Sequence, residues 1–511
     1  MTEPTISYWH QTEQPLTYPS LIESITTETL IIGGGITGVS AAYCLAEKGA
    51  QVTLIEADSL CSGTTGNTTG KTTIQHGLLY HSIKSKHGKD FARLYAKSQT
   101  DALYFIKDTV EKLSIPCGFT MNTSYVYART EKEFEAMETE HETVSSLGID
   151  GLLIRHPGFP KDNRGMLGFQ NQGVFHPIRY VNGLAVASVA NGASIYCGTK
   201  AVKIEHDGDS VTVLCNTGVS VKAKHLIIAT GYPVYDGMKF FFTRLYPRRD
   251  YGIAVIPEKE WPEGSYVAES DPVRSVRTHM ENGQRILIVV GETHVTGRGD
   301  ENTEAHFDEL IKFARELAGV KQVIAKWSAQ DYMTPDKIPY IGRISDQSDL
   351  FVASGFNKWG MTGGTLAGMM LSDLIVTGKN PYEELYSLSR SDILSSPGTV
   401  LKEVGGFTLE LIKSKLEKTD GIRNLTKGEG KVILFGGDKA GIYRDENDNI
   451  TVLDIACTHL STELNFNRAE RSWDCPAHGG RFSAMDGTRL EGPPKQPLKI
   501  YLQCKYSDLF E

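Results

Sequence analysis

The chain of 511 residues is long enough for about three domains with cores of their own. Hydrophobic residues make up 40% and charged residues 23%, which is typical of a soluble globular protein. The net charge of −9 gives no basic footprint, and no apolar run is long enough for a bilayer. We therefore expect neither nucleic-acid binding nor a membrane span. The N-terminus has no secretion-signal pattern and the cysteines have no disulfide-like spacing, so we expect a cytoplasmic protein.

The first informative stretch predicts a dinucleotide site. It has the required order of a β-rich strand, a glycine turn, a helix, a second strand and an acid: residues 29–32, then Gly33, Gly35 and Gly38, then 39–48, 51–55 and Glu56. Gly33 would allow a tight turn, Gly35 close approach to the pyrophosphate, and Gly38 close helix packing. The phosphates would lie at the helix N-terminus. Glu56 would accept from ribose hydroxyls and repel a 2′-phosphate, which argues against NADP.

Later segments favour FAD over NAD. Strands predicted at 221–228 and 350–354 end near Gly231 and Gly355, and an apolar helix follows at 366–375. A helix N-terminus made of small residues suits the pyrimidine end of a flavin, where negative charge develops on reduction. Small residues at 63–70 would let the backbone lie against a ring system, although they also suit a flexible loop. The expected FAD contacts are Gly33, Gly35, Gly38, Glu56, Thr64, Thr65, Thr69, Gly70, Gly231, Gly355, Gly360, Met361 and Thr362.

In this order, the motifs resemble the D-amino-acid-oxidase-like family of FAD-dependent oxidoreductases over about residues 7–390. The resemblance implies an α/β FAD-binding Rossmann-type domain and an α+β substrate domain. The FAD part would comprise about 1–100, 160–240 and 330–385, and the substrate part about 101–159 and 241–329. Some relatives tether FAD through a histidine in the segment that corresponds to 63–70. Asn67 stands closest to that position here, so we expect FAD to be bound non-covalently.

The family resemblance also implies the chemistry. A C–H next to an amine gives hydride to the flavin, and water hydrolyses the resulting imine. No dedicated base is needed if the amine arrives neutral. The histidines among the pocket candidates also suit structural hydrogen bonding, and the lysines also suit solvated positions. Arg298 would clamp a substrate carboxylate, or lie on the surface in its glycine-rich loop. The pocket candidates are Lys71, His76, Tyr251, His294, Arg298, Lys358 and Trp359.

The chain after residue 390 changes character. Residues 391–420 predict a linker followed by a helix with Leu409, Ile412 and Leu416 on one face. From 421 to 511, short strands with Gly and Asp turns predict a small all-β domain.

This C-terminal region holds the most specific motif of the chain, Cys457-x-His459 with Cys475-x-x-His478. Two cysteines and two histidines are the ligands of a Rieske [2Fe–2S] cluster, in which the histidines hold one of the irons. Zinc is the alternative, but its ligands usually come as Cys-x2-4-Cys and His-x3-5-His pairs. The residues after Cys475 and the proline-rich loop 492–498 also resemble Rieske loops. We therefore predict a Rieske domain at 421–511 with these four ligands.

Two positions beside the cluster depart from respiratory-complex relatives. Those relatives place a serine and a tyrosine hydroxyl against the cluster sulfurs, whereas Gly480 and Phe482 stand there in this chain. Hydrogen bonds to sulfur raise the potential, so we expect roughly −150 mV rather than +300 mV.

Together the motifs predict an FAD-dependent dehydrogenase that oxidises an amine or amino-acid-like small molecule. Electrons would pass from the flavin to the Rieske cluster and on to an external one-electron acceptor. Two alternatives stay open: a flavin that exchanges electrons with a partner protein, and an oxidase that uses O2 beside a structural or sensing cluster. A Rieske oxygenase is rejected, because its mononuclear iron needs two histidines after the Rieske domain and no histidine follows His478.

Overall fold

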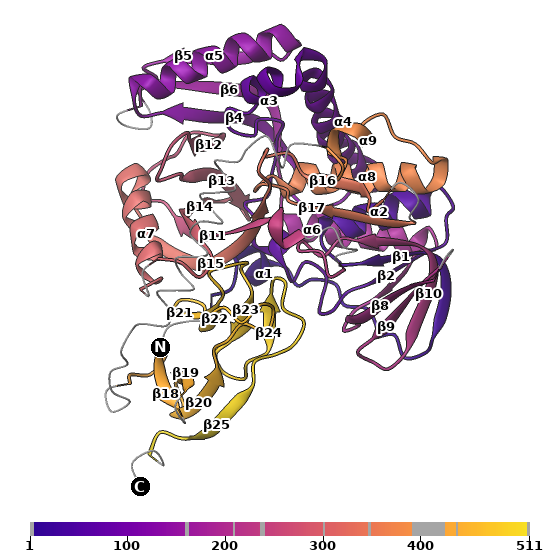
Figure 1. Cartoon of the computed structure of the whole chain (residues 1–511). Coiled ribbons are helices and arrows are strands. Elements are labelled where there is room, and N and C mark those ends of the chain that lie inside the picture. Colours follow the sequence, from indigo (N-terminus) through magenta and orange to yellow (C-terminus); the bar gives the residue numbers. More distant parts are fainter. Residues whose placement is uncertain are drawn as a thin grey trace.

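The computed structural model describes residues 5–158, 163–207, 210–235, 241–299, 302–345, 349–390, 425–435 and 438–507. Figure 1 shows two large sheets with their helices, and a smaller β domain at the C-terminal end of the chain. The predicted linker and helix at 391–420 lie outside the described residues. Within the described ranges, no helix combines the length and the apolar character that crossing a bilayer requires.

The first large sheet contains eight of the described strands and is mostly parallel. Its order is β16-β17-β10-β1-β2-β7, with β9 paired to β10 and β8 to β9. The strands are β1 (Ile25–Ile32), β2 (Val52–Ile55), β7 (Ser194–Tyr196), β8 (Ala201–Asp207), β9 (Ser210–Cys215), β10 (Ser220–Ile228), β16 (Tyr340–Arg343) and β17 (Leu350–Ser354). The predicted strands at 29–32, 51–55, 221–228 and 350–354 are confirmed, and all belong to this sheet.

The second large sheet contains nine of the described strands in the order β15-β11-β14-β13-β12-β4-β6-β3, with β5 paired to β6. The strands are β3 (Lys71–Thr72), β4 (Thr120–Ala128), β5 (Gly151–Arg155), β6 (Gly165–Val174), β11 (Tyr246–Ile256), β12 (Ser265–Ala268), β13 (Ser275–Glu281), β14 (Gln284–Val295) and β15 (Gln322–Met333). The sequence placed 160–240 in the FAD part, but β6 pairs in this second sheet.

Helices cover both sheets. The described helices are α1 (Tyr8–Thr12), α2 (Ile36–Glu47), α3 (Tyr80–His87), α4 (Lys89–Leu113), α5 (Glu131–Leu147), α6 (Pro177–Ala190), α7 (Ala305–Ala318), α8 (Gly360–Thr377) and α9 (Glu383–Tyr386), with single 3-10 turns at Thr64–Asn67 and Phe241–Thr243. The apolar helix α2 packs against α6 and α8, and its side chains are almost all buried. Gly368 of α8 lies so close to α2 that a Cβ would be 2.6 Å from the Ser40 side chain. The small residues of α8 therefore let the two helices approach.

The C-terminal domain contains two four-stranded antiparallel sheets. The first is β18 (Gly430–Phe435), β19 (Asp438–Arg444), β20 (Asn449–Asp454) and β25 (Ile500–Lys505). The second is β21 (Asn465–Asn467), β22 (Ser472–Asp474), β23 (Arg481–Ser483) and β24 (Arg489–Glu491). In Figure 1 the second sheet lies next to β15, and the first lies farther away. The predicted all-β character of this domain is confirmed.

Candidate functional site

The turn between β1 and α2 has the geometry that a bound pyrophosphate requires. Gly33 has φ +115°, and a Cβ there would be 2.5 Å from the carbonyl oxygen of Ala229. A Cβ at Gly38 would overlap the carbonyl oxygen of Gly33. At Gly35, by contrast, a Cβ would meet only the side chain of Thr65, with its Oγ1 3.0 Å away. The backbone at Gly33 and Gly38 is therefore closely packed, whereas the backbone at Gly35 leaves room for a phosphate at the helix N-terminus.

Glu56 follows β2 and lies beside the same turn. Its carboxylate accepts from the Gly34 amide at 2.6 Å and from the Asp58 amide at 3.0 Å. Burial raises the pKa of Glu56, although these amide donors act in the opposite direction. The carboxylate thus lies at the carboxyl end of β2, where a ribose is bound in this kind of fold.

Three side chains that are distant in the sequence donate hydrogen bonds to backbone carbonyls of the segment 63–70. The indole of Trp9 donates to the Thr68 carbonyl at 2.6 Å, and the indole of Trp327 donates to the Asn67 carbonyl at 2.9 Å. Arg277 donates to the Thr69 carbonyl. The sequence did not single out Arg277. Its position within a β-strand, β13, was the one available signal. The burial of its side chain is seen only in the structure.

The expected late contacts lie around the start of α8. Gly231 follows β10 with φ +72°, and a Cβ there would meet no atom within 4 Å. Gly355 follows β17 with φ +74°. Thr362, in the first turn of α8, accepts from the Thr73 amide at 3.0 Å and so joins this helix to the end of β3. Small residues and open backbone thus fit an extended cofactor that runs from Gly35 to the N-terminus of α8.

Three of the predicted pocket residues lie together. The Lys71 ammonium group is 5.6 Å from the ring centre of Trp359 and donates to Ser275 Oγ at 2.7 Å. Burial, with the charge of Arg277, lowers the pKa of Lys71 to about 7. The His76 ring stacks on Trp359 with a centroid distance of 4.9 Å.

His76 has a structural environment. Its Nδ1 lies 2.7 Å from the Tyr95 hydroxyl and its Nε2 lies 2.8 Å from the Thr73 carbonyl. Burial lowers its pKa to about 4, so the ring is neutral and Nε2–H donates to Thr73. Both ring nitrogens are therefore occupied.

The other four candidates have different partners. Tyr251 is fully buried, and its hydroxyl lies 3.2 Å from His294 Nε2. Lys358 forms an ion pair with the buried Asp250 at 2.8 Å, so it is not a solvated lysine. The Arg298 Nε donates to the carbonyl of Pro476 at 3.0 Å. Arg298 therefore contacts the C-terminal domain. The sequence predicted either a clamp for a substrate carboxylate or a surface arginine, and neither prediction included this contact between domains.

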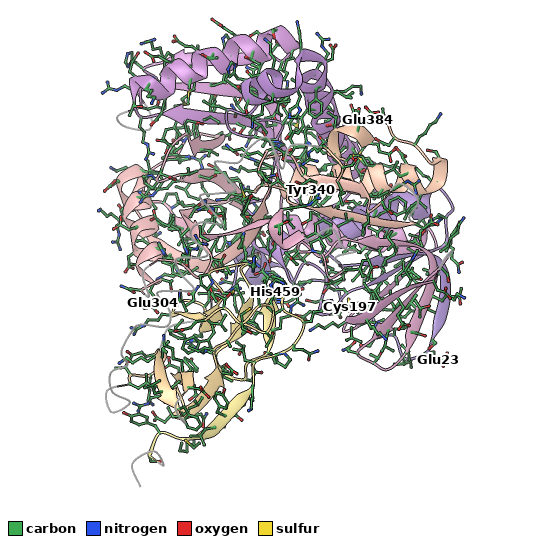
Figure 2. All side chains as sticks on the ribbon, in the orientation of Figure 1. Glu23, Cys197, Glu304, Tyr340, Glu384 and His459 are labelled. Atoms are coloured by element: carbon green, nitrogen blue, oxygen red, sulfur yellow. The ribbon has the colours of Figure 1, made fainter. Side chains whose placement is uncertain are left out.

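The four predicted metal ligands come together at one end of the C-terminal domain. Cys457 follows β20 and Cys475 follows β22, and their exposures are 2% and 1%. The rings of His459 and His478 lie 5.1 Å apart. Figure 2 shows His459 at the end of the domain that faces the two large sheets.

The environment of the Cys475 thiol suits a thiolate ligand, whereas the hydrogen bond to Cys475, together with burial, raises the pKa of Cys457. A hydrogen bond from Cys457 lowers the pKa of the Cys475 thiol to about 7, and backbone amides of residues 477, 478 and 480 act in the same direction against burial. The proline-rich loop covers the site, because a Cβ at Gly480 would be 2.6 Å from Pro494 Cγ and 3.4 Å from Cys457 Sγ. A buried pair of thiols, amide donors and two histidines is the donor set that a [2Fe–2S] cluster of this type needs.

The loop of residues 475–479 rests on the large sheets; we call it the cluster-ligand loop because it carries two of the predicted ligands, Cys475 and His478. A Cβ at Gly297 would be 2.7 Å from the Cys475 carbonyl carbon, and Gly479 packs on Pro247. The Gln330 side chain donates to the Gly479 carbonyl at 3.1 Å. Sequence reasoning missed Gln330 and Gly297, since neither residue type nor spacing marks a contact with a segment so far away in the sequence.

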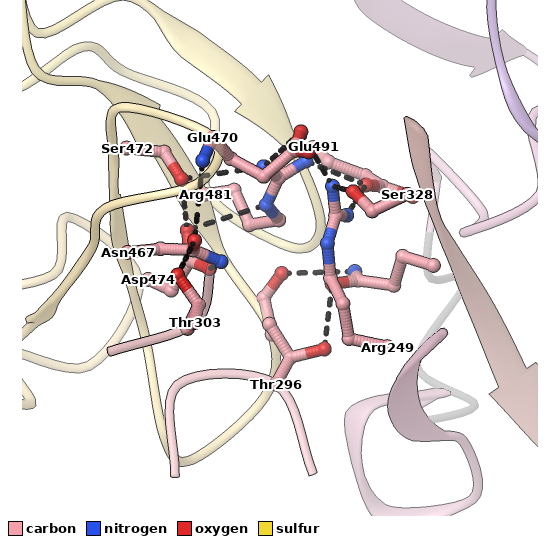
Figure 3. Close-up of polar contacts among 12 residues, drawn as sticks. Arg249, Thr296, Thr303, Ser328, Asn467, Glu470, Ser472, Asp474, Arg481 and Glu491 are labelled. Atoms are coloured by element: carbon pink, nitrogen blue, oxygen red, sulfur yellow. Dashed lines mark hydrogen bonds and ion pairs between the residues drawn. The ribbon is translucent and has the colours of Figure 1, made fainter. Parts of the chain in front are cut away.

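Buried charges surround these contacts (Figure 3). Arg249 of β11 pairs with Glu470 at 2.9 Å, and Arg481 lies 3.5 Å from Glu470 and 3.2 Å from Asp474. Thr303 donates to Asn467 at 2.8 Å, and Asn467 donates to Asp474 at 3.0 Å. The interface between the C-terminal domain and the large sheets is therefore polar and extensively hydrogen-bonded.

Comparison with known proteins agrees with both halves of this description. Residues 28–374 match the family of FAD dependent oxidoreductases (DAO), and residues 418–502 match the Rieske [2Fe-2S] domain. The chain is 36% identical over 495 residues to YhfW of Bacillus subtilis, described as a Rieske 2Fe-2S iron-sulfur protein, covering 96% of this chain and 97% of that one. It is 24% identical to gamma-glutamylputrescine oxidoreductase of Escherichia coli, covering 73% and 90%. The solved structure of glycine oxidase from Geobacillus kaustophilus superposes with a TM-score of 0.60 at 20% identity, covering 71% and 99%.

The chain therefore belongs to the DAO family of FAD-dependent oxidoreductases and carries a C-terminal Rieske domain. Its cofactors are FAD and a [2Fe–2S] cluster. The predicted fold class, an α/β and α+β oxidoreductase with an all-β Rieske domain, is confirmed.

Proposed function

We propose that the protein oxidises an amine that also carries a carboxylate, and that its electrons leave through the Rieske cluster to an external one-electron acceptor. The names of two kinds of relatives support an amine as the donor: gamma-glutamylputrescine oxidoreductase and glycine oxidase. Bound FAD supplies a hydride acceptor, and the protein supplies position and electrostatics. Non-covalent binding of FAD and a cytoplasmic location belong to the same proposal.

The charges beside the segment 63–70 favour a donor with a carboxylate. Lys71 is half-buried and Arg277 is fully buried, and neither forms an ion pair with a carboxylate among the described residues. Burial lowers the pKa of Arg277 as well, to about 9. A positive region of this kind would stabilise an anionic group of the donor. We infer that Lys71, with Ser275 and Trp359, orients that group.

One observation carries the electron-exit part of the proposal. Thr64, an expected FAD contact, donates to the backbone carbonyl of Gln330 at 3.0 Å. The side chain of the same Gln330 donates to Gly479, next to the cluster ligand His478. A single residue thus joins the expected FAD loop to the cluster-ligand loop.

An anaerobic screen tests the donor. Amines with and without a carboxylate would be mixed with the protein while the flavin absorbance is followed, and carboxylate-bearing amines are expected to bleach it faster. Absence of bleaching by every amine would contradict the proposal and favour a flavin that exchanges electrons with a partner protein.

Turnover with a one-electron acceptor then tests the exit. Cys457→Ser is expected to leave the first reduction of the flavin unchanged and to abolish multiple turnover. Cys504→Ser, a half-buried cysteine of the same domain outside the ligand set, serves as the control and should behave as wild type. Full turnover of Cys457→Ser in air, with peroxide as product, would instead favour an oxidase.

A further inference from the structure

The antiparallel ribbon of β11 and β15 separates the expected FAD loop from the cluster-ligand loop. Arg249 pairs with Gln330 across the ribbon, and Gly252 pairs with Trp327. Paired residues share a face, and successive residues of a strand alternate between faces. Because Trp327 and Gln330 are three residues apart, their side chains lie on opposite faces. Trp327 donates to Asn67 on one side, and Gln330 donates to Gly479 on the other.

Gln330 is fixed from every side. Its side chain is 2% exposed, and its Oε1 accepts from Thr296 at 2.8 Å. Its Nε2 donates to the Tyr332 hydroxyl at 2.8 Å and to the Gly479 carbonyl at 3.1 Å. Both N–H donors of the Gln330 amide are therefore used, its oxygen accepts one hydrogen bond, and these three bonds fix the orientation of the side chain.

The loop after β14 makes the second fixed contact. Gly297 has φ +72° and lies against the backbone of Cys475 and Pro476, where a Cβ would be 2.7 Å from both. The neighbouring Arg298 donates to the Pro476 carbonyl. The backbone of Gly297 therefore packs directly on the backbone of Cys475, a predicted cluster ligand, without an intervening side chain.

We propose that the β11–β15 ribbon is a permanent bridge that holds the His478 side of the cluster against the FAD loop, with Gln330 and Gly297 as positioning residues. Electrons would then cross one layer of sheet, and the Rieske domain would keep its position against the flavin domain during the transfer. This inference rests on the proposed electron exit, but it does not depend on the identity of the donor. Electron transfer slows steeply with separation, so a small displacement of the loop would be measurable.

Two glycine variants form a matched pair for the test. Gly297→Ala places a methyl group against Cys475 and Pro476, so the cluster loop must shift. Gly299→Ala, in the same loop with φ +110°, carries comparable backbone strain but meets no atom within 4 Å. Gln330→Glu is a third variant of the same size as the native residue, and its carboxylate is unable to donate to the Gly479 carbonyl. It keeps the bridge testable if Gly297→Ala fails to fold.

The measurement starts from photoreduction of the flavin by a light flash, with oxalate as the sacrificial electron donor, so no amine is needed. Transfer to the wild-type cluster is expected to be independent of added glycerol, because no domain moves. Gly297→Ala and Gln330→Glu should slow it severalfold, since the rate of electron transfer falls steeply as the two cofactors move apart. The electron paramagnetic resonance spectrum of the chemically reduced cluster should change in the same two variants and stay unchanged in Gly299→Ala.

A transfer rate that falls with glycerol in the wild type would overturn the bridge and indicate a moving domain. Unchanged rate and spectrum in both Gly297→Ala and Gln330→Glu would overturn it as well. If photoreduced flavin reduces the cluster but no amine reduces the flavin, the bridge stands and the proposed donor is wrong. If an amine reduces the flavin but no electron reaches the cluster, the bridge itself is wrong.

Discussion

Replacing Arg249 by methionine is expected to destabilise the attachment of the Rieske domain. The Arg249 side chain is 3% exposed and that of Glu470 is 14% exposed. The variant would leave Glu470 buried with one remaining cation, Arg481, at 3.5 Å. Removing one partner of a buried ion pair costs about 3–5 kcal/mol, and we expect the lower end, about 3 kcal/mol, because Arg481 remains.

The pH dependence of this loss has a definite sign. Burial alone would raise the pKa of Glu470, but the charges of Arg249 and Arg481 outweigh it and lower the pKa. A depressed pKa means that the carboxylate stabilises the fold above its ordinary pKa and that this contribution is lost as the pH falls through the folded value. The difference between wild type and Arg249→Met should therefore be largest near neutral pH and shrink in acid.

Urea unfolding followed by cluster absorbance measures the loss. The control is Arg468→Met, which breaks an interdomain ion pair with Glu304 at 3.8 Å whose side chains are 45% and 38% exposed. An exposed pair is worth about 0–1 kcal/mol. Arg249→Met combined with Glu470→Gln should recover part of the loss, because no charge is left buried without its partner. Equal losses for Arg249→Met and Arg468→Met, or a loss that persists in acid, would refute the reasoning.

Three further predictions concern the cofactors and the donor. FAD should leave the protein on acid denaturation, because Asn67 stands where some relatives carry a tethering histidine; flavin that precipitates with the chain would contradict this. Phe482→Tyr should raise the cluster potential by adding a hydroxyl within the core that contains both predicted cysteine ligands, whereas Phe466→Tyr at the edge of that core should change it less, as redox titration would show. Lys71→Met should raise KM for a carboxylate-bearing donor by about tenfold or more below pH 7, while Lys71→Arg retains binding. Since the pKa of Lys71 is lowered to about 7, the wild-type KM should itself rise as the pH increases through that value, and a flat profile would speak against the role of Lys71.

The sequence predicted those parts of the fold whose signals are local. The glycine turn after β1, the start of α8 and the Cys and His spacing each depend on a few adjacent residues with a narrow physical requirement. The pocket residues were harder, because a side chain's partner depends on the face of its strand and on strand pairing. His76 and Tyr251 were chosen by residue type alone, and both turn out to be buried with partners of their own.

The predicted role of Arg298 shows the same limit more sharply. An arginine in a glycine-rich loop suggests anion binding, and nothing local distinguishes a ligand carboxylate from a backbone carbonyl. Its partner, Pro476, is 178 residues away in sequence and belongs to another domain. Only the docking of that domain decides between the two interpretations, and docking depends on complementary side chains such as Arg249 and Glu470 that no local pattern marks.

The polar character of the interface fits the role proposed for it. An apolar interface stabilises contact through area and tolerates sliding, whereas hydrogen-bonded charges have one geometry of lowest energy. A buried ionic network adds little net stability over apolar packing, so its value lies in fixing orientation, which we propose for this protein. Arg249 and Gln330 are paired neighbours on one face of the ribbon. The residue that fixes the Rieske domain and the residue that contacts its ligand loop are thus set by the same strand register, and a shift of that register would displace both together.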